Sequence, residues 1–273
     1  MKKIIIVLVF IFSQFSNACN TLYEAQKIAL LQYKFVLVNI MESEGTTNRK
    51  FFMLEKEDLG LMSNYVCLNL YKGQDNSEIS KCKIYNYPTL LIIDGNGVEI
   101  YRYANSLDLM GFKPALENFN NCPVSLINDL KSFNEKNNYY SAIRIAQSYL
   151  DYSLSLEANL KFEIYHVCDL YLKKAISLVK KSDKLYDEKI QKMEILMKFK
   201  LAYQKNFPEL NEQLSYDDKF TFESNKLISY FLRYINSKSQ NTNELASIES
   251  KIKQYEGFED YIKKADLILS QEF

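Results

Sequence analysis

The sequence predicts two domains in series, an α/β domain followed by an all-α domain of helical hairpins. Residues 90–93 are a continuous run of apolar strand formers, and Asp94-Gly95-Asn96-Gly97 behind them is a strong hairpin signal. Glycine and proline are scarce, with seven and four copies in 273 residues, which favours long helices over an all-β fold. After Pro123 there is no glycine until Gly257 and one proline, Pro208, so the helices are expected to concentrate there.

The charge balance bears on the class of partner. Lys+Arg and Asp+Glu number 34 each, and the formal net charge is zero. A protein that binds nucleic acid through bulk charge needs an excess of basic residues. We therefore expect no nucleic-acid partner.

Residues 1–18 have the pattern of a secretory signal peptide. Two lysines follow Met1, Ile4 to Phe12 form a short apolar run, and Ser16 and Ala18 are small residues before a cleavage point. The apolar run is too short to span a bilayer. The pattern predicts export, to the periplasm or as a secreted protein, and a buried N-terminal strand is the alternative reading.

A lipid anchor at Cys19 is an alternative that the sequence leaves open. A cysteine directly after the predicted cut resembles the lipidation site of bacterial lipoproteins, which usually carry Leu three residues before the cut. Ser16 stands there instead and fits ordinary signal-peptidase cleavage better. If Cys19 is lipidated, we expect the protein to be a lipoprotein anchored in a membrane. We expect no other membrane contact.

The α/β domain is expected to span residues 19–120. Thr21 can cap a first helix, whose apolar residues recur on one face. Pro88 stands at the start of a strand, where its missing N–H does least harm. The elements expected in chain order are a helix at 20–32, strands at 35–40 and 65–70, a short helix at 77–85, strands at 90–93 and 98–103, and a helix at 106–119 broken near Gly111 and Pro114.

This order of elements resembles a thioredoxin fold. Tyr87-Pro88-Thr89 ahead of the hairpin resembles the family's cis-proline, which is usually followed by Thr, and X-Pro bonds are the ones that adopt cis at low cost. Residues 35–40 resemble the family's central strand, 65–70 its parallel neighbour, and 114–119 its last helix. The resemblance covers roughly residues 22–120 and implies a mixed central sheet flanked by helices.

The redox cysteine pair of that family is missing. In redox-active members a Cys-x-x-Cys pair follows the central strand, where a helix N-terminus acidifies the first thiol. Residues 42–50 contain no cysteine, so dithiol–disulfide exchange by the family mechanism is excluded. Thr46, Thr47 or Asn48 is expected to cap the following helix. A hydroxyl beside Pro88 can also hydrogen-bond an extended peptide laid along the groove.

The remaining cysteines leave a competing function open. Four cysteines remain after Cys19, namely Cys67, Cys82, Cys122 and Cys168. In an oxidising compartment an even number of cysteines permits one disulfide, but the sequence does not determine which two are joined. Buried free thiols are expected for Cys67 and Cys82. The competing function is a thiol–disulfide oxidoreductase that works through such displaced cysteines.

The all-α domain is expected to span residues 124–273, after a breaker-rich boundary. Its clearest helix carries an apolar stripe from Leu160 to Leu178. Residues 141–146 and 174–179 lie 33 residues apart, near the tetratricopeptide period, but the other signature positions of that repeat are not filled. Generic antiparallel hairpins are therefore favoured. Further helices are expected at 125–135, 138–152, 184–206, 218–237, 241–255 and 258–271.

No residue pattern predicts a metal, a cofactor or a catalytic group. His166 is the single histidine, and its place in an apolar helix near Cys168 indicates a core or boundary position. We expect a non-catalytic binding or scaffold module of the cell envelope, with a protein or peptide as its partner. The groove residues that we expect to take part are Thr46, Thr47, Asn48, Tyr87, Pro88 and Thr89.

Overall fold

The computed structural model describes residues 19–42, 60–104, 111–215 and 221–271. The chain divides into two compact units, the first ending at Glu135 and the second beginning at Lys136. The predicted signal peptide, residues 1–18, lies outside the described residues. Within the described ranges no helix has the length and apolar character needed to cross a membrane.

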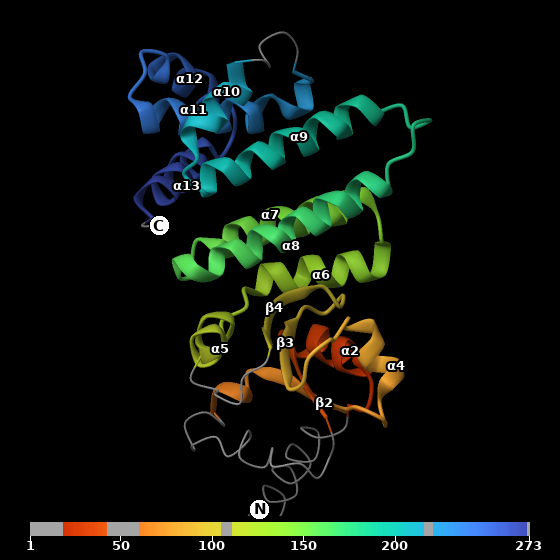
Figure 1. The fold of residues 1–273 in the computed structure, drawn as a ribbon. Coiled ribbons are helices and arrows are strands. Elements are labelled where there is room, and N and C mark those ends of the chain that lie inside the picture. Colours follow the sequence, from red (N-terminus) through yellow and green to blue (C-terminus); the bar gives the residue numbers. More distant parts are fainter. Residues whose placement is uncertain (1–18, 43–59, 105–110, 216–220, 272–273) are drawn as a thin grey trace, which may run out of the picture. The chain divides into compact units, whose positions relative to one another are not determined.

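The first unit contains a four-stranded mixed sheet in the order β2-β1-β3-β4 (Figure 1). The central strand β1 (Phe35–Met41) pairs in parallel with β2 (Tyr65–Tyr71) and antiparallel with β3 (Thr89–Ile93). Strand β3 continues through a tight turn into β4 (Glu99–Ala104), also antiparallel. The predicted strands and hairpin are confirmed, and so is the α/β class of this unit.

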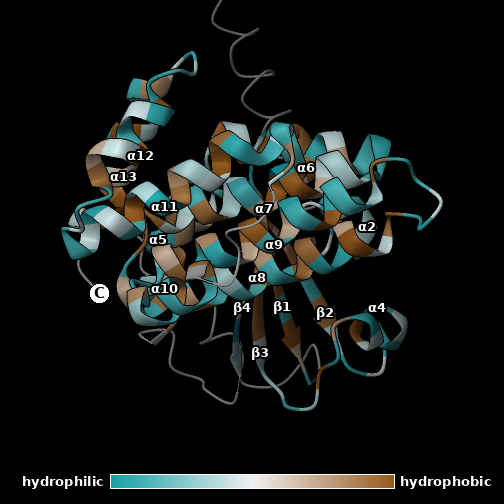
Figure 2. Ribbon diagram, turned by 90° about the horizontal axis from the view of Figure 1, so that it is seen from above, coloured by the Kyte–Doolittle hydropathy of each residue, from teal (hydrophilic) through white to brown (hydrophobic). Residues whose placement is uncertain are grey.

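Both faces of β1 are covered, and all seven of its residues are buried. Because side chains alternate along a strand, Val36, Val38 and Ile40 share one face, where they join a core with Ala25 and Ala29 of helix α2 (Leu22–Gln32). Thr21 caps α2 as predicted, since its hydroxyl accepts the Glu24 N–H at 3.2 Å. Figure 2 shows the hydrophobic colours along β1 and β3.

Helix α5 (Lys113–Phe119) is tied to the sheet by aromatic contacts and one hydrogen bond. The Tyr101 ring lies 5.8 Å from Phe112 and 6.1 Å from Phe119, and the Tyr65 hydroxyl donates to the Leu116 carbonyl at 2.7 Å. Pro114 lies in the first turn of α5, where no N–H is needed. Residues 105–110 of the predicted helix lie outside the described residues.

The hairpin turn is held by Asp94, whose side chain is fully buried. Its Oδ1 accepts the N–H groups of Asn96 (2.8 Å) and Val98 (2.9 Å). Gly97 has a φ of 82°, and a Cβ there would lie 2.6 Å from Nε2 of Gln26 in α2. The sequence signal for this turn therefore reflects both a positive φ and a close approach to a helix.

One helix is shorter than predicted. Helix α4 (Asn76–Lys81) ends before the predicted residue 85, because Lys83 adopts a φ of 50° that ends the helix. Helix α6 (Val124–Lys136) is present where a helix is predicted, at 125–135, but it falls almost wholly in the first unit, whereas the sequence places the domain boundary before it, at residues 118–123. The Asn96 side chain donates to the Leu130 carbonyl at 3.2 Å, which ties α6 to the hairpin turn.

The second unit is helical, as predicted. Figure 2 shows hydrophilic and hydrophobic residues side by side on its helices, as expected for amphipathic packing. Asn138 and Ser141 form a capping box at the start of α7, and Tyr149 of α7 stacks on Tyr171 of α8 at 5.8 Å. The helices are α7 (Tyr139–Ser153), α8 (Ala158–Ser177), α9 (Tyr186–Tyr203), α10 (Phe207–Ser215), α11 (Lys226–Gln240), α12 (Leu245–Ile252) and α13 (Phe258–Ser270), with a 3-10 turn at Glu223–Asn225.

Helix α10 is absent from the sequence prediction, which ends one helix at residue 206 and begins the next at 218. Pro208 stands in the first turn of α10. A proline is tolerated there because the first N–H groups of a helix have no partner within it.

Candidate functional site: the proline loop

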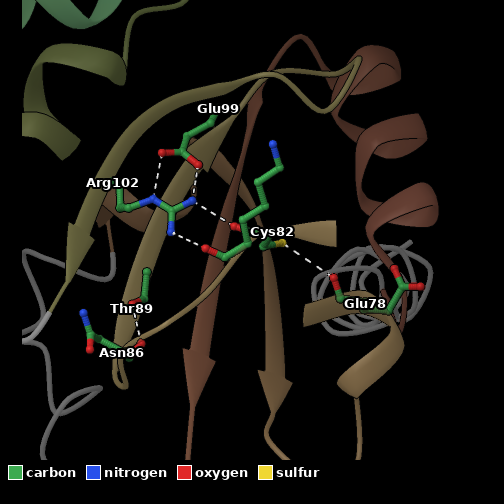
Figure 3. A network of polar contacts seen from close by, with 7 residues as sticks. Glu78, Cys82, Asn86, Thr89, Glu99 and Arg102 are labelled. Atoms are coloured by element: carbon green, nitrogen blue, oxygen red, sulfur yellow. Dashed lines mark hydrogen bonds and ion pairs between the residues drawn. The ribbon is translucent and has the colours of Figure 1, made fainter. Parts of the chain in front are cut away.

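The candidate site is the segment between α4 and β3, residues 83–88, which we name the proline loop. Its last peptide bond, Tyr87–Pro88, is cis, as the sequence predicts. Tyr85 is 84% exposed, and Tyr87 and Pro88 are half-buried. Figure 3 shows the side chains that hold the two ends of this loop.

Arg102 of β4 holds the beginning of the proline loop. Its Nη2 donates to the Cys82 carbonyl at 2.8 Å and its Nη1 to the Lys83 carbonyl at 3.2 Å (Figure 3). Its Nε donates to Glu99 Oε1 at 2.8 Å, and Nη2 pairs with the second oxygen of that carboxylate. The hydrogen bond with Glu99 raises the pKa of Arg102 above its usual value. The planar, charged guanidinium thus links the loop to the hairpin.

Thr89 holds the end of the loop. Its side chain is buried, with 1% exposed, and Oγ1 donates to the Asn86 carbonyl at 2.7 Å. The hydroxyl proton is therefore used inside the protein. Of the groove residues predicted from the sequence, Thr89 is buried and holds the loop through this hydrogen bond, whereas Tyr87 and Pro88 contribute to the surface of the loop.

The main chain between these two anchors has few partners among the described residues. The N–H and C=O groups of Ile84, Tyr85 and Tyr87 make no hydrogen bond with those residues, whereas the Asn86 carbonyl accepts from Thr89. Because this stretch is partly exposed, water can solvate these groups when nothing is bound. Within the described part of the chain, the loop thus presents main-chain donors and acceptors without a protein partner next to two tyrosine rings.

Tyr87 lies near the carboxyl ends of the parallel strands. Lys72, directly after β2, places its Nζ 4.9 Å from the centre of the Tyr87 ring and 3.4 Å from Oε1 of Glu42, directly after β1. The side chains of Lys72 and Glu42 are 50% and 65% exposed, so this ion pair is weak. In open α/β sheets ligands bind at this edge.

Three sequence-predicted site residues, Thr46, Thr47 and Asn48, lie outside the described residues. The structure therefore brings together Tyr87, Pro88 and Thr89 and does not place the other three. Cys19, the predicted lipidation candidate, is half-buried and packs against the core under α2.

All five cysteines are free thiols in the structure. Cys67 and Cys82 are partly buried, which corrects the expectation of full burial. Burial raises the pKa of each to about 11. The pKa of Cys168 rises to about 12 and that of Cys122 rises further, again through burial. At neutral pH only about one thiol in ten thousand is ionised when its pKa is about 11.

Asn39 is a residue of interest that the sequence reasoning missed. It lies in β1 opposite Leu90, two residues from Pro88, and is 1% exposed. Its Nδ2 donates to Asn69 Oδ1 at 3.1 Å, whereas its own Oδ1 has no partner. A buried acceptor left unpaired costs about 1–3 kcal/mol. The sequence signal was a polar residue inside an apolar strand.

The described residues contain no group of three or more candidate metal ligands. His166 is exposed on α8, so the expected core or boundary position is wrong, while Cys168 two residues later is buried. Residues two apart on a helix point in different directions, and a Cys–His dyad does not form.

Comparisons with known proteins assign no family to this chain. No protein-family model matches it, and no curated protein matches it either. The geometry of the proline loop is therefore the basis for a functional assignment.

Proposed function

We propose that the first unit is a thioredoxin-like domain that binds an extended peptide or protein segment at the proline loop, without redox chemistry. The proposal is supported by the order of its parts: a parallel β1–β2 pair, a cis-proline, an antiparallel hairpin and the closing helix α5. The observation that carries it is the main chain of Ile84, Tyr85 and Tyr87, which is held between Arg102 and Thr89 and makes no hydrogen bond with the described residues.

The physical argument rests on backbone recognition. An extended peptide can pair its own N–H and C=O groups with free main-chain groups, as in strand addition, and this needs little specific side-chain sequence. Anchoring the loop in advance lowers the conformational entropy that binding costs. Tyr85 and Tyr87 add aromatic contact area. The partner class is therefore a peptide in extended conformation.

The competing function is thiol–disulfide exchange through Cys67 or Cys82. The raised pKa of both thiols weighs against it, because the thiolate is the reactive form. We further propose export through residues 1–18, to the periplasm or the cell exterior, with lipidation of Cys19 as the alternative to a free N-terminus.

The peptide-binding proposal is tested with a displayed library of random twelve-residue peptides selected on the full chain. Bound peptides are expected to protect the amides of residues 84–87 from hydrogen exchange. The double variant Tyr85→Ala, Tyr87→Ala is expected to weaken their binding about tenfold or more. Tyr23→Ala is the matched control, since Tyr23 is 71% exposed on α2, away from the loop. Protection that maps outside the loop would contradict the proposal.

The redox alternative has its own test. We expect alkylation of the native thiols to be slow at pH 7 and to speed up about tenfold for each pH unit up to about 11, because the thiolate fraction rises in that proportion. Insulin reduction should not exceed the uncatalysed rate. A native thiol whose labelling rate levels off below pH 8, together with insulin reduction, would favour the oxidoreductase.

A further inference from the structure

The second unit contains a solvent-accessible cavity of about 370 Å³ between helices α7, α9, α11 and α13. This volume is within the range of small-molecule sites. The cavity is lined by apolar side chains deep inside and by charged side chains at its rim, and no part of the proposed peptide site contributes to it.

The deep wall of the cavity is largely aromatic. The Phe231 ring lies 5.5 Å from Phe199 and 5.1 Å from Tyr261, so the three rings pack in a continuous row. Leu150 and Leu196 are buried beside them. A ligand that enters this cavity must place an apolar body against this wall, since a polar group there would lose its hydration without a partner.

One rim carboxylate, Asp151, is already neutralised. It accepts a hydrogen bond from the Tyr203 hydroxyl at 2.7 Å and pairs with Lys264 Nζ at 2.5 Å. Tyr203 is buried, and desolvation followed by the charge of Asp151 raises its pKa well above the usual value. The Tyr203 hydroxyl therefore stays protonated and keeps donating to Asp151.

The second lysine that lines the cavity is Lys192 of α9. It forms no hydrogen bond or ion pair with the described residues. Glu188, one turn earlier on α9, accepts a hydrogen bond from the Ser224 hydroxyl at 2.5 Å and makes no ion pair with Lys192. Two lysines and one carboxylate thus line the cavity, and Lys192 is the lysine that makes no ion pair within the described residues.

We propose that this cavity binds a small amphipathic carboxylate. Its apolar body packs on the row of Phe199, Phe231 and Tyr261, and its carboxylate pairs with Lys192. An amine of the same shape would place its positive charge beside that of Lys192, and a neutral alcohol would give Lys192 no ion-pair partner. The cavity thus selects by head-group charge as well as by shape.

The test uses three probes with one apolar body: 4-phenylbutyrate, 4-phenylbutan-1-ol and 4-phenylbutylamine, titrated calorimetrically into the full chain. The carboxylate is expected to bind about tenfold or more tighter than the alcohol, and the amine weakest. Lys192→Gln should remove this preference and leave alcohol binding unchanged. Lys263→Gln is the charge-matched control, because Lys263 is 79% exposed and does not line the cavity.

A second variant tests the cavity itself. Leu227→Trp adds bulk to a half-buried lining residue and should abolish binding of the carboxylate and the alcohol, with the helical circular dichroism retained. The proposal is overturned if none of the probes binds, if carboxylate and alcohol bind equally, if the amine binds as tightly as the carboxylate, or if Lys263→Gln matches Lys192→Gln.

Discussion

The proline loop and the cavity of the helical unit leave different groups free for a ligand. The loop offers main-chain donors and acceptors of Ile84, Tyr85 and Tyr87, next to the rings of an exposed and a half-buried tyrosine. The cavity offers an apolar wall and a lysine that makes no ion pair within the described residues. Main-chain groups are nearly the same in every residue, so a site built from them recognises the conformation of a peptide rather than its sequence. Side chains in a cavity select a shape and a charge.

The supports of the two sites differ as well. The loop is held by a few polar contacts from Arg102 and Thr89, whereas the cavity wall is held by the packing of buried rings. Polar contacts each contribute a modest net free energy, while buried aromatic packing contributes several times more. Substitutions in the two regions should therefore change the free energy of unfolding by different amounts, and they should affect the binding of different ligands.

The largest effect is expected for Phe231→Ala. Phe231 is 2% exposed and contacts both Phe199 and Tyr261, so its truncation leaves a void. The free energy of unfolding of the helical unit should fall by about 3–5 kcal/mol, measured by urea denaturation. Phe162→Ala on α8, where the ring is 62% exposed, is the control and should change it by less than about 1 kcal/mol. Equal losses would contradict the packing comparison.

A smaller effect is expected for Arg102→Met. The change removes the hydrogen bonds to the Cys82 and Lys83 carbonyls and the pair with Glu99, in a side chain that is 30% exposed. Stability should fall by about 1–2 kcal/mol in urea denaturation, and the selected peptides should bind more weakly, because the loop loses one of its anchors. Lys27→Met, at an exposed position on α2, provides the control for loss of charge. Unchanged peptide binding would show that Arg102 does not hold the loop.

Thr89→Val removes one hydrogen bond with almost no change in shape. The Asn86 carbonyl loses its donor, but Asn86 is exposed and water can replace the hydroxyl, so a loss of about 1 kcal/mol is expected. Thr89→Ser retains the hydroxyl and should bind the selected peptides like the original chain, whereas Thr89→Val should bind them more weakly. If Thr89→Val and Thr89→Ser bind them equally, the hydrogen bond is not what anchors this end.

The smallest effect is expected for Asn39→Leu. The native amide already has an unpaired oxygen in the core, and Asn69, which would lose its partner, is exposed. The unfolding free energy should therefore stay within about 1 kcal/mol of the original value or rise. Asn39→Asp, which adds charge at the same place, should destabilise strongly. A loss above 2 kcal/mol for Asn39→Leu would mean that the amide makes a contact that matters to the fold.

Local patterns of the sequence were sufficient for most elements of both units. Apolar runs, the Asp94–Gly97 turn, the Thr21 cap and the proline before β3 each act over a few residues, and the structure confirms them. The prediction left out α10, a nine-residue helix whose first turn contains Pro208. Prediction from the sequence was therefore most accurate where the conformation of a short segment depends on its own residues.

Apolar periodicity and turn residues act locally, so they were enough to predict that an α/β part precedes a helical part. Only the folded chain shows that Arg102 holds a loop 19 residues earlier, that α6 joins the first unit, and that His166 faces solvent. The same holds for Lys192, which lines one cavity with a row of rings and makes no ion pair within the described residues. These contacts join residues distant in the chain, and their free energy depends on three-dimensional packing that no local pattern encodes.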